Sequence, residues 1–385
     1  MNQPEDCIFY QTVELPGLGV IPGSWDHREA TDVFLGHVDF NQKTVLDVGP
    51  ANGFFSFEME KRGGIVTAID LGQDAPWDVV PHPYLDEETL VSNMRRNVRK
   101  VENAFWYCHR ALHSKVQLVY GSVYDVPKVV KPVEIALMSN VLQHFRDPLM
   151  AIQRVAQVVT ETLVITETLW HDEPGFVDSA AIRLIPRSET PEVCHSWYQA
   201  SPSFVMELVK LLGFPEMKCE VHDQQFNATS ADFVPRKIKH FTVTARRPRP
   251  LAPAALAQLP VEYLAGFHAP ERDDKRRWRW TSAQQAEITV TNLSDQEVAV
   301  SLAFGLASVT PSATVTLTAN EAPVWQGTSF FGIRPVHVPS LTLRPGRTIL
   351  RFSSTGAVAI QGTEESRPLC LKLFELTLCQ PCASI

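Results

Sequence analysis

Apolar residues in the first two-thirds of the chain occur in two kinds of run that alternate along the sequence. Short continuous apolar runs predict buried strands at 44–48, 65–70, 117–123, 133–140, 162–168 and 239–246. Helical spacing predicts helices at 54–62, about 87–113, 147–157 and 201–214. Strands that alternate with helices predict an α/β fold, in which a mostly parallel, doubly wound sheet carries helices on both faces.

The pattern changes after residues 246–260, RRPRPLAPAALAQLP. Prolines remove backbone donors and block regular structure, so 248–261 is predicted to be a semi-rigid linker. Beyond it, apolar and polar positions alternate with a period of two in AEITVTN, VAVSLAF, ATVTLTA, LTLRPGRTILRF and LKLFELTL. This alternation predicts an all-β sandwich. The expected domains are therefore 1–247 and 262–385, joined by the linker.

The length of the chain agrees with two domains, and its charge limits the classes of partner that are expected. A chain of 385 residues is longer than one compact core needs. The net charge of −8 falls on residues 1–250, because residues 251–385 hold 11 basic and 11 acidic groups. Proteins that grip a nucleic acid usually present a basic face, so a nucleic acid partner is not expected. The sequence shows no signal peptide and no apolar run of about 18 residues, which predicts a cytoplasmic protein without a membrane partner.

A turn rich in small residues follows the first predicted strand. Residues 44–54 read TVLDVGPANGF, in which Asp47 precedes Gly49, Ala51 and Gly53 at intervals of two. Small residues let the backbone approach a ligand closely, and free amides at the start of the next helix attract polar groups. Asp70 ends the second predicted strand, where a carboxylate can accept hydrogen bonds from both ribose hydroxyls. The turn and the acid predict a cofactor that contains a nucleoside, either NAD or S-adenosylmethionine.

The segment TVLDVGPANGFFSFEMEKRGG…VTAIDLG resembles the first two motifs of class I S-adenosylmethionine-dependent methyltransferases. It is most similar to the branch around the bacterial tRNA wobble-uridine carboxymethyltransferase. Three further stretches resemble the same branch: YQTVELPGLGVIPGSWD (10–26), YGSVYDVP (120–127) and SNVLQHFRDPL (139–149). The resemblance covers about residues 8–247. It implies a Rossmann-like methyltransferase domain that uses S-adenosylmethionine and releases S-adenosylhomocysteine.

The resemblance also implies which residues hold the cofactor. The turn would surround its methionine part with Asp47, Gly49, Pro50, Ala51, Asn52 and Gly53. The ribose would be held by Asp70, with Leu71 beside it. Ser122 and Val123 would flank the adenine, and Asn140 and Val141 would lie beneath the cofactor. Ser122 departs from the pattern, because many methyltransferases have an acidic residue there that binds the adenine amino group.

Methyl transfer to an alcohol needs a base near the mouth of the cofactor site. His171 follows the fifth predicted strand, in LWHDEP, and is expected to be this base. His144 follows the fourth strand and is either a second candidate base or the anchor of a helix, and Glu167 is a third candidate. No metal is expected, although Glu167, His171 and Asp172 form an alternative site for a divalent cation.

Four aromatic residues fall in segments expected around the same mouth: Trp25, Trp170, Trp197 and Tyr198. Aromatic walls suit a flat ring, a sugar face or a sulfonium, and they are the expected substrate contacts. The alternative is that they pack a lid onto the core.

The sequence therefore predicts an O- or N-methyltransferase that acts on a small metabolite, a natural product or a glycan precursor. A tRNA wobble-uridine modifier is the alternative that the resemblance suggests, and a binding protein without catalysis is the third. The all-β domain could bind a carbohydrate, mediate a homodimer or cover the active site, and a bare interaction or scaffolding role is the default.

Overall fold

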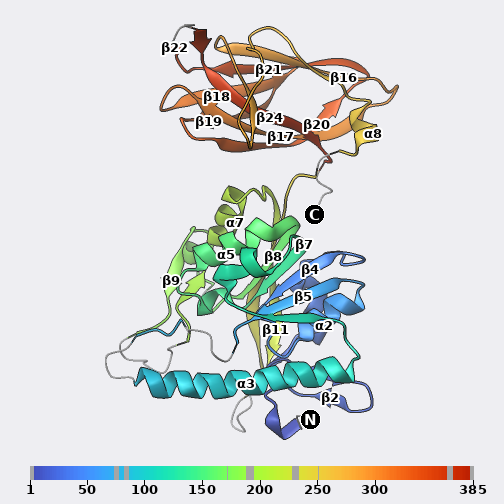
Figure 1. Cartoon of the computed structure of the whole chain (residues 1–385), viewed down its shortest axis with the longest axis vertical. Coiled ribbons are helices and arrows are strands. Elements are labelled where there is room, and N and C mark those ends of the chain that lie inside the picture. Colours follow the sequence, from blue (N-terminus) through green and yellow to red (C-terminus); the bar gives the residue numbers. More distant parts are fainter. Residues whose placement is uncertain are drawn as a thin grey trace. The chain divides into compact units, whose positions relative to one another are not determined.

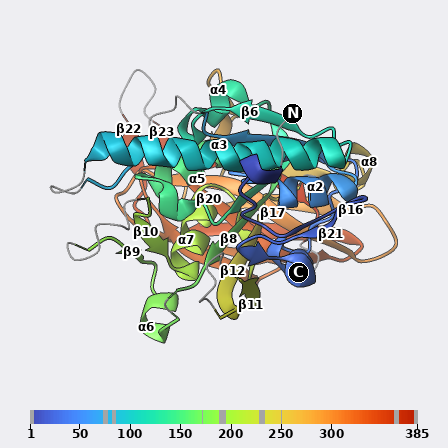
Figure 2. The same ribbon diagram turned by 90° about the horizontal axis from the view of Figure 1, so that it is seen from below.

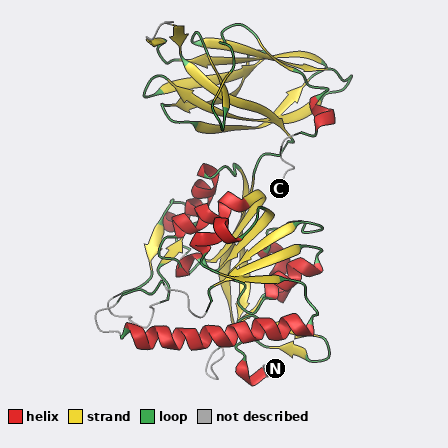
Figure 3. Ribbon diagram, in the orientation of Figure 1, coloured by secondary structure: helices red, strands yellow, loops and turns green. Residues whose placement is uncertain are grey.

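The computed structural model describes residues 4–72, 78–81, 86–170, 172–187, 195–227, 234–249, 251–361 and 367–381. The chain divides into two compact units, Met1–Arg247 and Pro248–Ile385. Figure 3 shows that the first contains both helices and strands, whereas the second consists of strands almost throughout.

A mixed eight-stranded sheet forms the centre of the first unit (Figure 1). In spatial order its strands are β3 (Trp25–Asp26), β11 (Glu216–Phe226), β12 (Arg236–Arg246), β8 (Val159–Thr168), β7 (Val133–Ser139), β4 (Thr44–Val48), β5 (Ile65–Asp70) and β6 (Gln117–Tyr120). The five strands from β6 to β8 are parallel, whereas β12 runs antiparallel to β8 and β11 antiparallel to β12. The strand order reverses direction between β4 and β7, and open α/β sheets bind ligands at the carboxyl ends of strands at such a point.

The helices of this unit cover both faces of the sheet. They are α1 (Thr31–Phe34), α2 (Phe54–Lys61), α3 (Glu87–Ala111), α4 (Val126–Val129), α5 (Pro148–Val158), α6 (Pro174–Val177) and α7 (Pro202–Leu211), with 3-10 turns η1 (Pro4–Asp6), η2 (Arg28–Ala30), η3 (Val123–Asp125) and η4 (Leu142–His144). Two short hairpins, β1–β2 (Val13–Leu15, Gly19–Ile21) and β9–β10 (Ile182–Leu184, Tyr198–Ala200), complete it. Figures 1 and 2 show α3 as the long cyan helix that crosses one end of this unit.

Local sequence explains where the two best-defined helices begin. Asp147 accepts a hydrogen bond from the amide of Met150 at 2.8 Å, and Ser201 accepts one from the amide of Phe204 at 3.1 Å. Each cap is followed by a proline at the first helical position, where no amide donor is needed. The predicted helix starts are therefore correct to within a residue.

Alternation along the strands builds two apolar cores, one on each face of the sheet. In β4, Val45 packs into one core, whereas Leu46 and Val48 pack into the other. The sheet is therefore covered on both sides, as its continuous apolar strands predict.

The described residues of the second unit form β-strands and loops, apart from one helical turn. One five-stranded antiparallel sheet contains β13 (Val261–Tyr263), β16 (Gln285–Asn292), β21 (Gly346–Ser354), β18 (Ala313–Ala319) and β19 (Ala322–Ser329). The other contains β14 (Glu271–Arg272), β15 (Arg277–Trp280), β24 (Leu371–Cys379), β17 (Val298–Ser308) and β20 (Arg334–Leu343). A small hairpin joins β22 (Ala359–Gln361) to β23 (Arg367–Leu369). Residues of both five-stranded sheets, such as Leu317 and Leu302, share one apolar core.

One expectation about secondary structure is wrong, and one strand is missing from the prediction. The segment 248–261 is not irregular throughout, because α8 (Pro253–Leu256) forms within it and Leu259 is buried in the core of the second unit. Proline at the first helical position supports a short helix rather than blocking it. Strand β11 was not predicted, because its sequence EMKCEVHDQQF is mostly polar, yet it is held along its whole length by β12.

Candidate active site

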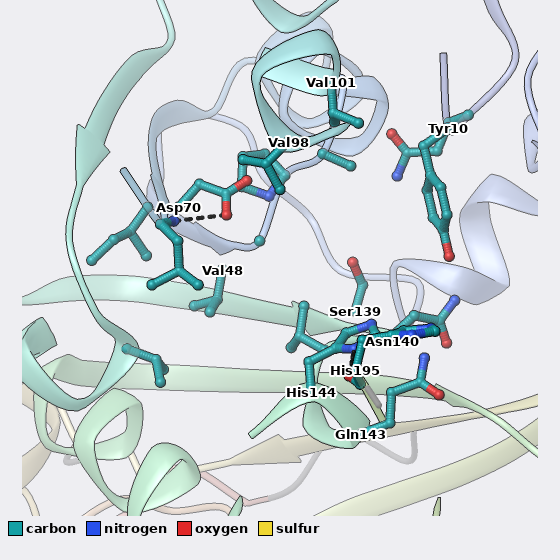
Figure 4. Close-up of a pocket in the computed structure, with 18 of the residues that line it drawn as sticks. Tyr10, Val48, Asp70, Val98, Val101, Ser139, Asn140, Gln143, His144 and His195 are labelled. Carbon is teal, nitrogen blue, oxygen red and sulfur yellow. Dashed lines mark hydrogen bonds between the residues drawn. The ribbon is translucent and has the colours of Figure 1, made fainter. Parts of the chain in front are cut away.

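A cavity of about 1000 Å³ opens at the carboxyl ends of the parallel strands in the first unit. Val48, Asp70, Tyr120 and Ser139 line it from the ends of β4, β5, β6 and β7. The segment before the sheet and the helix α3 supply further walls. Figure 4 shows Asp70 at one side of this cavity, and His144 and His195 at another. We refer to these two regions as the cofactor end and the acceptor end.

The turn after β4 has the backbone that its small residues predict. Gly49, Ala51 and Gly53 have φ angles of 72°, 51° and 89°, all in the left-handed region. A Cβ atom at Gly49 would lie 2.5 Å from Val141 Cγ1, and one at Gly53 would lie 2.4 Å from the ring of Phe57. Only glycine fits these two positions, whereas Ala51 adopts the same region at some cost in strain.

Asn52 connects this turn to the N-terminal segment. It is fully buried, and its Oδ1 accepts a hydrogen bond from the amide of Gln11 at 2.7 Å. Its Nδ2 donates to the carbonyl oxygen of Gln11 at 3.1 Å. Asn52 therefore fixes the segment that carries Tyr10 against the turn, and it does not itself line the cavity.

Asp47 lies buried beneath the turn. Its Oδ2 accepts a hydrogen bond from Ser56 Oγ at 2.5 Å, whereas its Oδ1 has no partner among the described residues. Burial raises the pKa of this carboxyl to about 7, with a smaller contribution from Asp70. This unpartnered oxygen lies behind the turn, because Asp47 does not line the cavity.

Asp70 marks the cofactor end of the cavity. Its Oδ1 accepts a hydrogen bond from the amide of Leu71 at 2.8 Å, and the amide of Ala51 also donates to this carboxylate. Burial, and then the nearby charge of Glu102, raise its pKa to about 6. The carboxylate is thus held in place at the end of β5, where the ribose of a nucleoside cofactor is expected.

The predicted adenine contacts lie next to it. Ser122 and Val123 line the cavity where β6 leads into η3. Ser122 Oγ accepts a hydrogen bond from the amide of Tyr124 at 3.3 Å, so it caps that turn.

Asn140 lies beyond the end of β7 in a left-handed conformation, with φ of 52°. Its Oδ1 accepts a hydrogen bond from Thr168 Oγ1 at 3.0 Å, and its Nδ2 lies 3.2 Å from His240 Nε2. These contacts fix the orientation of the amide at the floor of the cavity.

The structure brings most of the predicted cofactor residues to one cavity. Those that line it are Gly49, Pro50, Ala51, Asp70, Leu71, Ser122, Val123, Asn140 and Val141. Asp47, Asn52 and Gly53 lie behind the turn and support it.

His144 lines the acceptor end from η4. Its Nδ1 lies 2.6 Å from the carbonyl oxygen of His195. Because a carbonyl oxygen can only accept, Nδ1 carries the proton, and Nε2 is left with a lone pair. Burial lowers the pKa of both imidazoles, so both are neutral near pH 7. His144 therefore has the tautomer and the charge that a general base needs.

The other candidate bases are placed differently. Glu167 does not line the cavity. Its Oε1 accepts hydrogen bonds from the amides of Val141 and Leu142, both at 2.9 Å. Burial raises its pKa to about 8. It thus holds the start of η4, which carries His144. His171 lies outside the described residues, and Asp172 is paired with Lys239 at 2.5 Å.

Two of the four predicted aromatic contacts line the cavity. Trp25 is 3% exposed and Trp170 is 45% exposed. Trp197 lies outside the lining and donates from Nε1 to the carbonyl oxygen of Asp78 at 2.7 Å. Tyr198 pairs with Leu184 in the β9–β10 hairpin and does not line the cavity.

Sequence reasoning missed several lining residues. Tyr10, His195 and Gln143 lie in the acceptor end, and the first two come from segments far from the fourth strand (Figure 4). The sequence carries a periodic signal for the cavity residues of α3. Six of its residues recur at helical spacing and line the cavity: Met94, Asn97, Val98, Val101, Glu102 and Phe105.

Comparisons with known proteins assign the chain to no family. No family model and no curated protein matches the sequence. One solved structure to which the chain is similar is the N-terminal domain of EvdMO1 in the presence of SAH and D-fucose. The two are 15% identical with a TM-score of 0.42, and the match covers 63% of this chain and 93% of that chain. Magnesium protoporphyrin IX methyltransferase from Synechocystis PCC 6803 with bound SAH is 10% identical, with 57% and 81% covered and a TM-score of 0.35. The 1,6-didemethyltoxoflavin-N1-methyltransferase of Burkholderia thailandensis is 17% identical, with 57% and 77% covered and a TM-score of 0.34.

No helix within the described part of the chain is long and apolar enough to cross a membrane.

Proposed function

We propose that the first unit is an enzyme of the Rossmann-like class that binds a cofactor containing a nucleoside. The observation that carries this proposal is the turn from Gly49 to Gly53 facing Asp70 across the carboxyl ends of β4 and β5. The turn offers a close approach to backbone amides, and the acid offers acceptors for ribose hydroxyls.

Within that class we propose an S-adenosylmethionine-dependent methyltransferase. Dinucleotide-binding sheets of this type are parallel in the order 3-2-1-4-5-6. Here the antiparallel strand β12 lies between β8 and β11, and the strands beyond β8 all pair antiparallel to their neighbours. This end of the sheet favours S-adenosylmethionine over NAD.

The chemistry divides between the cofactor and the chain. When bound, S-adenosylmethionine supplies a methyl group on a positively charged sulfur, from which it can be displaced in line. The chain contributes alignment, exclusion of water and a place for the proton of the acceptor. Of the candidates His171, His144 and Glu167, we assign the base to His144, whose Nε2 lone pair is set by the bond from Nδ1 to the His195 carbonyl.

We further propose that the acceptor is a small molecule with a hydroxyl group. An amine that is already neutral would not need a base, whereas an alcohol must lose its proton as the methyl group arrives. Trp25 and Trp170 provide aromatic surface, and Asn140 and Gln143 provide neutral hydrogen-bonding groups at the same end. This combination suits a sugar-like or phenolic ring.

For the second unit we propose a β-sandwich accessory domain. Its two five-stranded sheets share one apolar core, which supports this arrangement.

Methyl labelling tests the function. The protein is incubated with S-adenosylmethionine carrying a deuterated methyl group, in separate reactions with a small-molecule extract and with bulk tRNA. We expect the label in a small molecule and none in tRNA, with the Asp70→Ala variant as the control that cannot hold the ribose. Label in tRNA would instead identify the protein as a tRNA-modifying enzyme.

A further inference from the structure

One face of α3 forms a wall of the cofactor end. Residues 94, 97, 98, 101, 102 and 105 recur at i, i+3, i+4, i+7, i+8 and i+11, which is one face of a helix, and all line the cavity. Met94, Val98, Val101 and Phe105 make this face largely apolar, and Glu102 places a carboxylate within it. Four basic residues of the same helix, at 95, 96, 99 and 100, do not line the cavity. An acid on the face that meets the ligand calls for a chemical explanation.

A relay of hydrogen bonds holds Glu102. The hydroxyl of Tyr120 donates to Glu102 Oε1, and Trp106 Nε1 donates to that hydroxyl oxygen at 3.0 Å. Trp106 lies one turn beyond Glu102 on α3, so the helix orients the hydroxyl of Tyr120 and that hydroxyl holds the carboxylate. A carboxylate that is held before the ligand arrives loses less conformational entropy on binding.

Glu102 is also close to the predicted ribose contact. Tyr120 is the direct neighbour of Asp70 in the parallel pairing of β5 and β6. The negative charge of Glu102 repels that of Asp70 and helps to raise the pKa of Asp70. Two carboxylates are thus gathered around one end of the cavity. Keeping them together is unfavourable unless a ligand supplies donors or positive charge.

The adenine side of the cavity lacks the acid that many methyltransferases carry in the loop after the third strand. At that position Ser122 uses its Oγ to cap the amide of Tyr124. Glu102 is bonded to Tyr120, which lies two residues before Ser122, and both Glu102 and Ser122 line the cavity. A carboxylate has about four acceptor positions, and the bond from Tyr120 occupies one of them.

We propose that Glu102 is a second carboxylate of the cofactor site and accepts a hydrogen bond from the adenosine part of S-adenosylmethionine. The donor is either a ribose hydroxyl or the amino group of adenine, and both are neutral donors to a charged acceptor. This inference rests on the proposed function. It places part of the nucleoside recognition on α3, a helix outside the motifs that the sequence displays.

Calorimetry with S-adenosylhomocysteine tests the inference without an acceptor. The Glu102→Gln variant preserves size and removes the charge, and we expect it to bind at least tenfold more weakly than the unmodified protein. Tyr120→Phe, which only releases Glu102, is expected to weaken binding about threefold. Glu88→Gln is the matched control, because Glu88 is an exposed glutamate on the first turn of the same helix, and it should bind as the unmodified protein does.

S-inosylhomocysteine, which lacks the adenine amino group, separates the two donors. If Glu102 accepts from the amino group, the unmodified protein prefers S-adenosylhomocysteine and Glu102→Gln loses that preference. If Glu102 accepts from the ribose, Glu102→Gln weakens both ligands equally.

The outcomes distinguish this inference from the function on which it rests. Binding by Glu102→Gln within twofold of the unmodified protein would overturn the role of Glu102 and leave the methyltransferase proposal standing. Failure of the unmodified protein to bind S-adenosylhomocysteine would remove the proposed function itself. Thermal unfolding of each variant checks that it is folded. If Glu102→Gln does not fold, the Tyr120→Phe variant decides, and binding by that variant equal to that of the unmodified protein would overturn the inference.

Discussion

The two ends of the cavity differ in how the chain builds them. The cofactor end comes from short, local segments, because Gly49, Ala51 and Asp70 lie within two consecutive β-strand and turn units. The acceptor end is assembled from segments that are distant in sequence, such as Tyr10, His144 and His195. A function based on the first end is therefore visible in the sequence, whereas the substrate, which depends on the second, is not.

The ends also differ in charge. Asp70 and Glu102 give the cofactor end two carboxylates. At the acceptor end, burial lowers the pKa of His144 and His195 and keeps both rings neutral near pH 7. The first end thus suits a ligand that brings donors and positive charge, and the second suits proton transfer from a neutral group.

The largest effect is expected at the acceptor end. Replacement of His144 by alanine removes the proposed base and should lower turnover about a hundredfold or more, with S-adenosylhomocysteine affinity changed by no more than a few fold. Single-turnover rates on the acceptor found by methyl labelling provide the measurement.

His171→Ala is the companion variant, since the sequence alone favoured His171 as the base. Near-normal turnover in His144→Ala with a large loss in His171→Ala would reverse the assignment. Near-normal turnover in both would indicate an acceptor that needs no base, such as a neutral amine.

At the cofactor end, Asp70→Ala should weaken S-adenosylhomocysteine binding by roughly thirtyfold to a hundredfold. The reason is a net loss of about 2–3 kcal/mol of charge-assisted hydrogen bonding to the ribose. Isothermal calorimetry measures it. Binding by Asp70→Ala within threefold of the unmodified protein would mean that the ribose lies elsewhere, and the distinction between the two ends would fail.

A smaller effect concerns the support beneath the acceptor end. Because the pKa of Glu167 is raised to about 8 in the folded state, its contribution to stability is greatest in acid and is lost as pH rises towards 8. In Glu167→Gln the amide oxygen can still accept from Val141 and Leu142 but does not titrate. We expect the unmodified protein to lose about 2 kcal/mol relative to this variant between pH 6 and pH 8, at about 1.4 kcal/mol per pH unit. Urea unfolding at a series of pH values checks this, and parallel curves for the two proteins would show that Glu167 is ionised throughout.

The smallest effect is expected on removal of the second unit. Among the described residues, all that line the cavity belong to Met1–Arg247. A chain ending at residue 247 should therefore bind S-adenosylhomocysteine with unchanged affinity in calorimetry. A tenfold loss would show that the accessory unit contributes to the cofactor end.

The difference between the ends also explains what the sequence predicted. The parallel strands and the turn were predicted because each is encoded by a continuous apolar run or by small residues in a fixed order, as in 44–54. Trp197 and Tyr198 were placed near the mouth only by their distance along the chain, and both lie outside the lining. His195 could not be found, because its carbonyl meets His144 through a tertiary contact that spans 51 residues. Polar strands such as β11 and contacts of this kind leave no periodic signal.

The most direct test of the central claim is calorimetry of the full chain with two ligands, S-adenosylhomocysteine and NADH. The account predicts that one molecule of S-adenosylhomocysteine binds per chain with a micromolar or lower Kd, and that NADH releases no heat of binding. Tight binding of NADH with no binding of S-adenosylhomocysteine would contradict it.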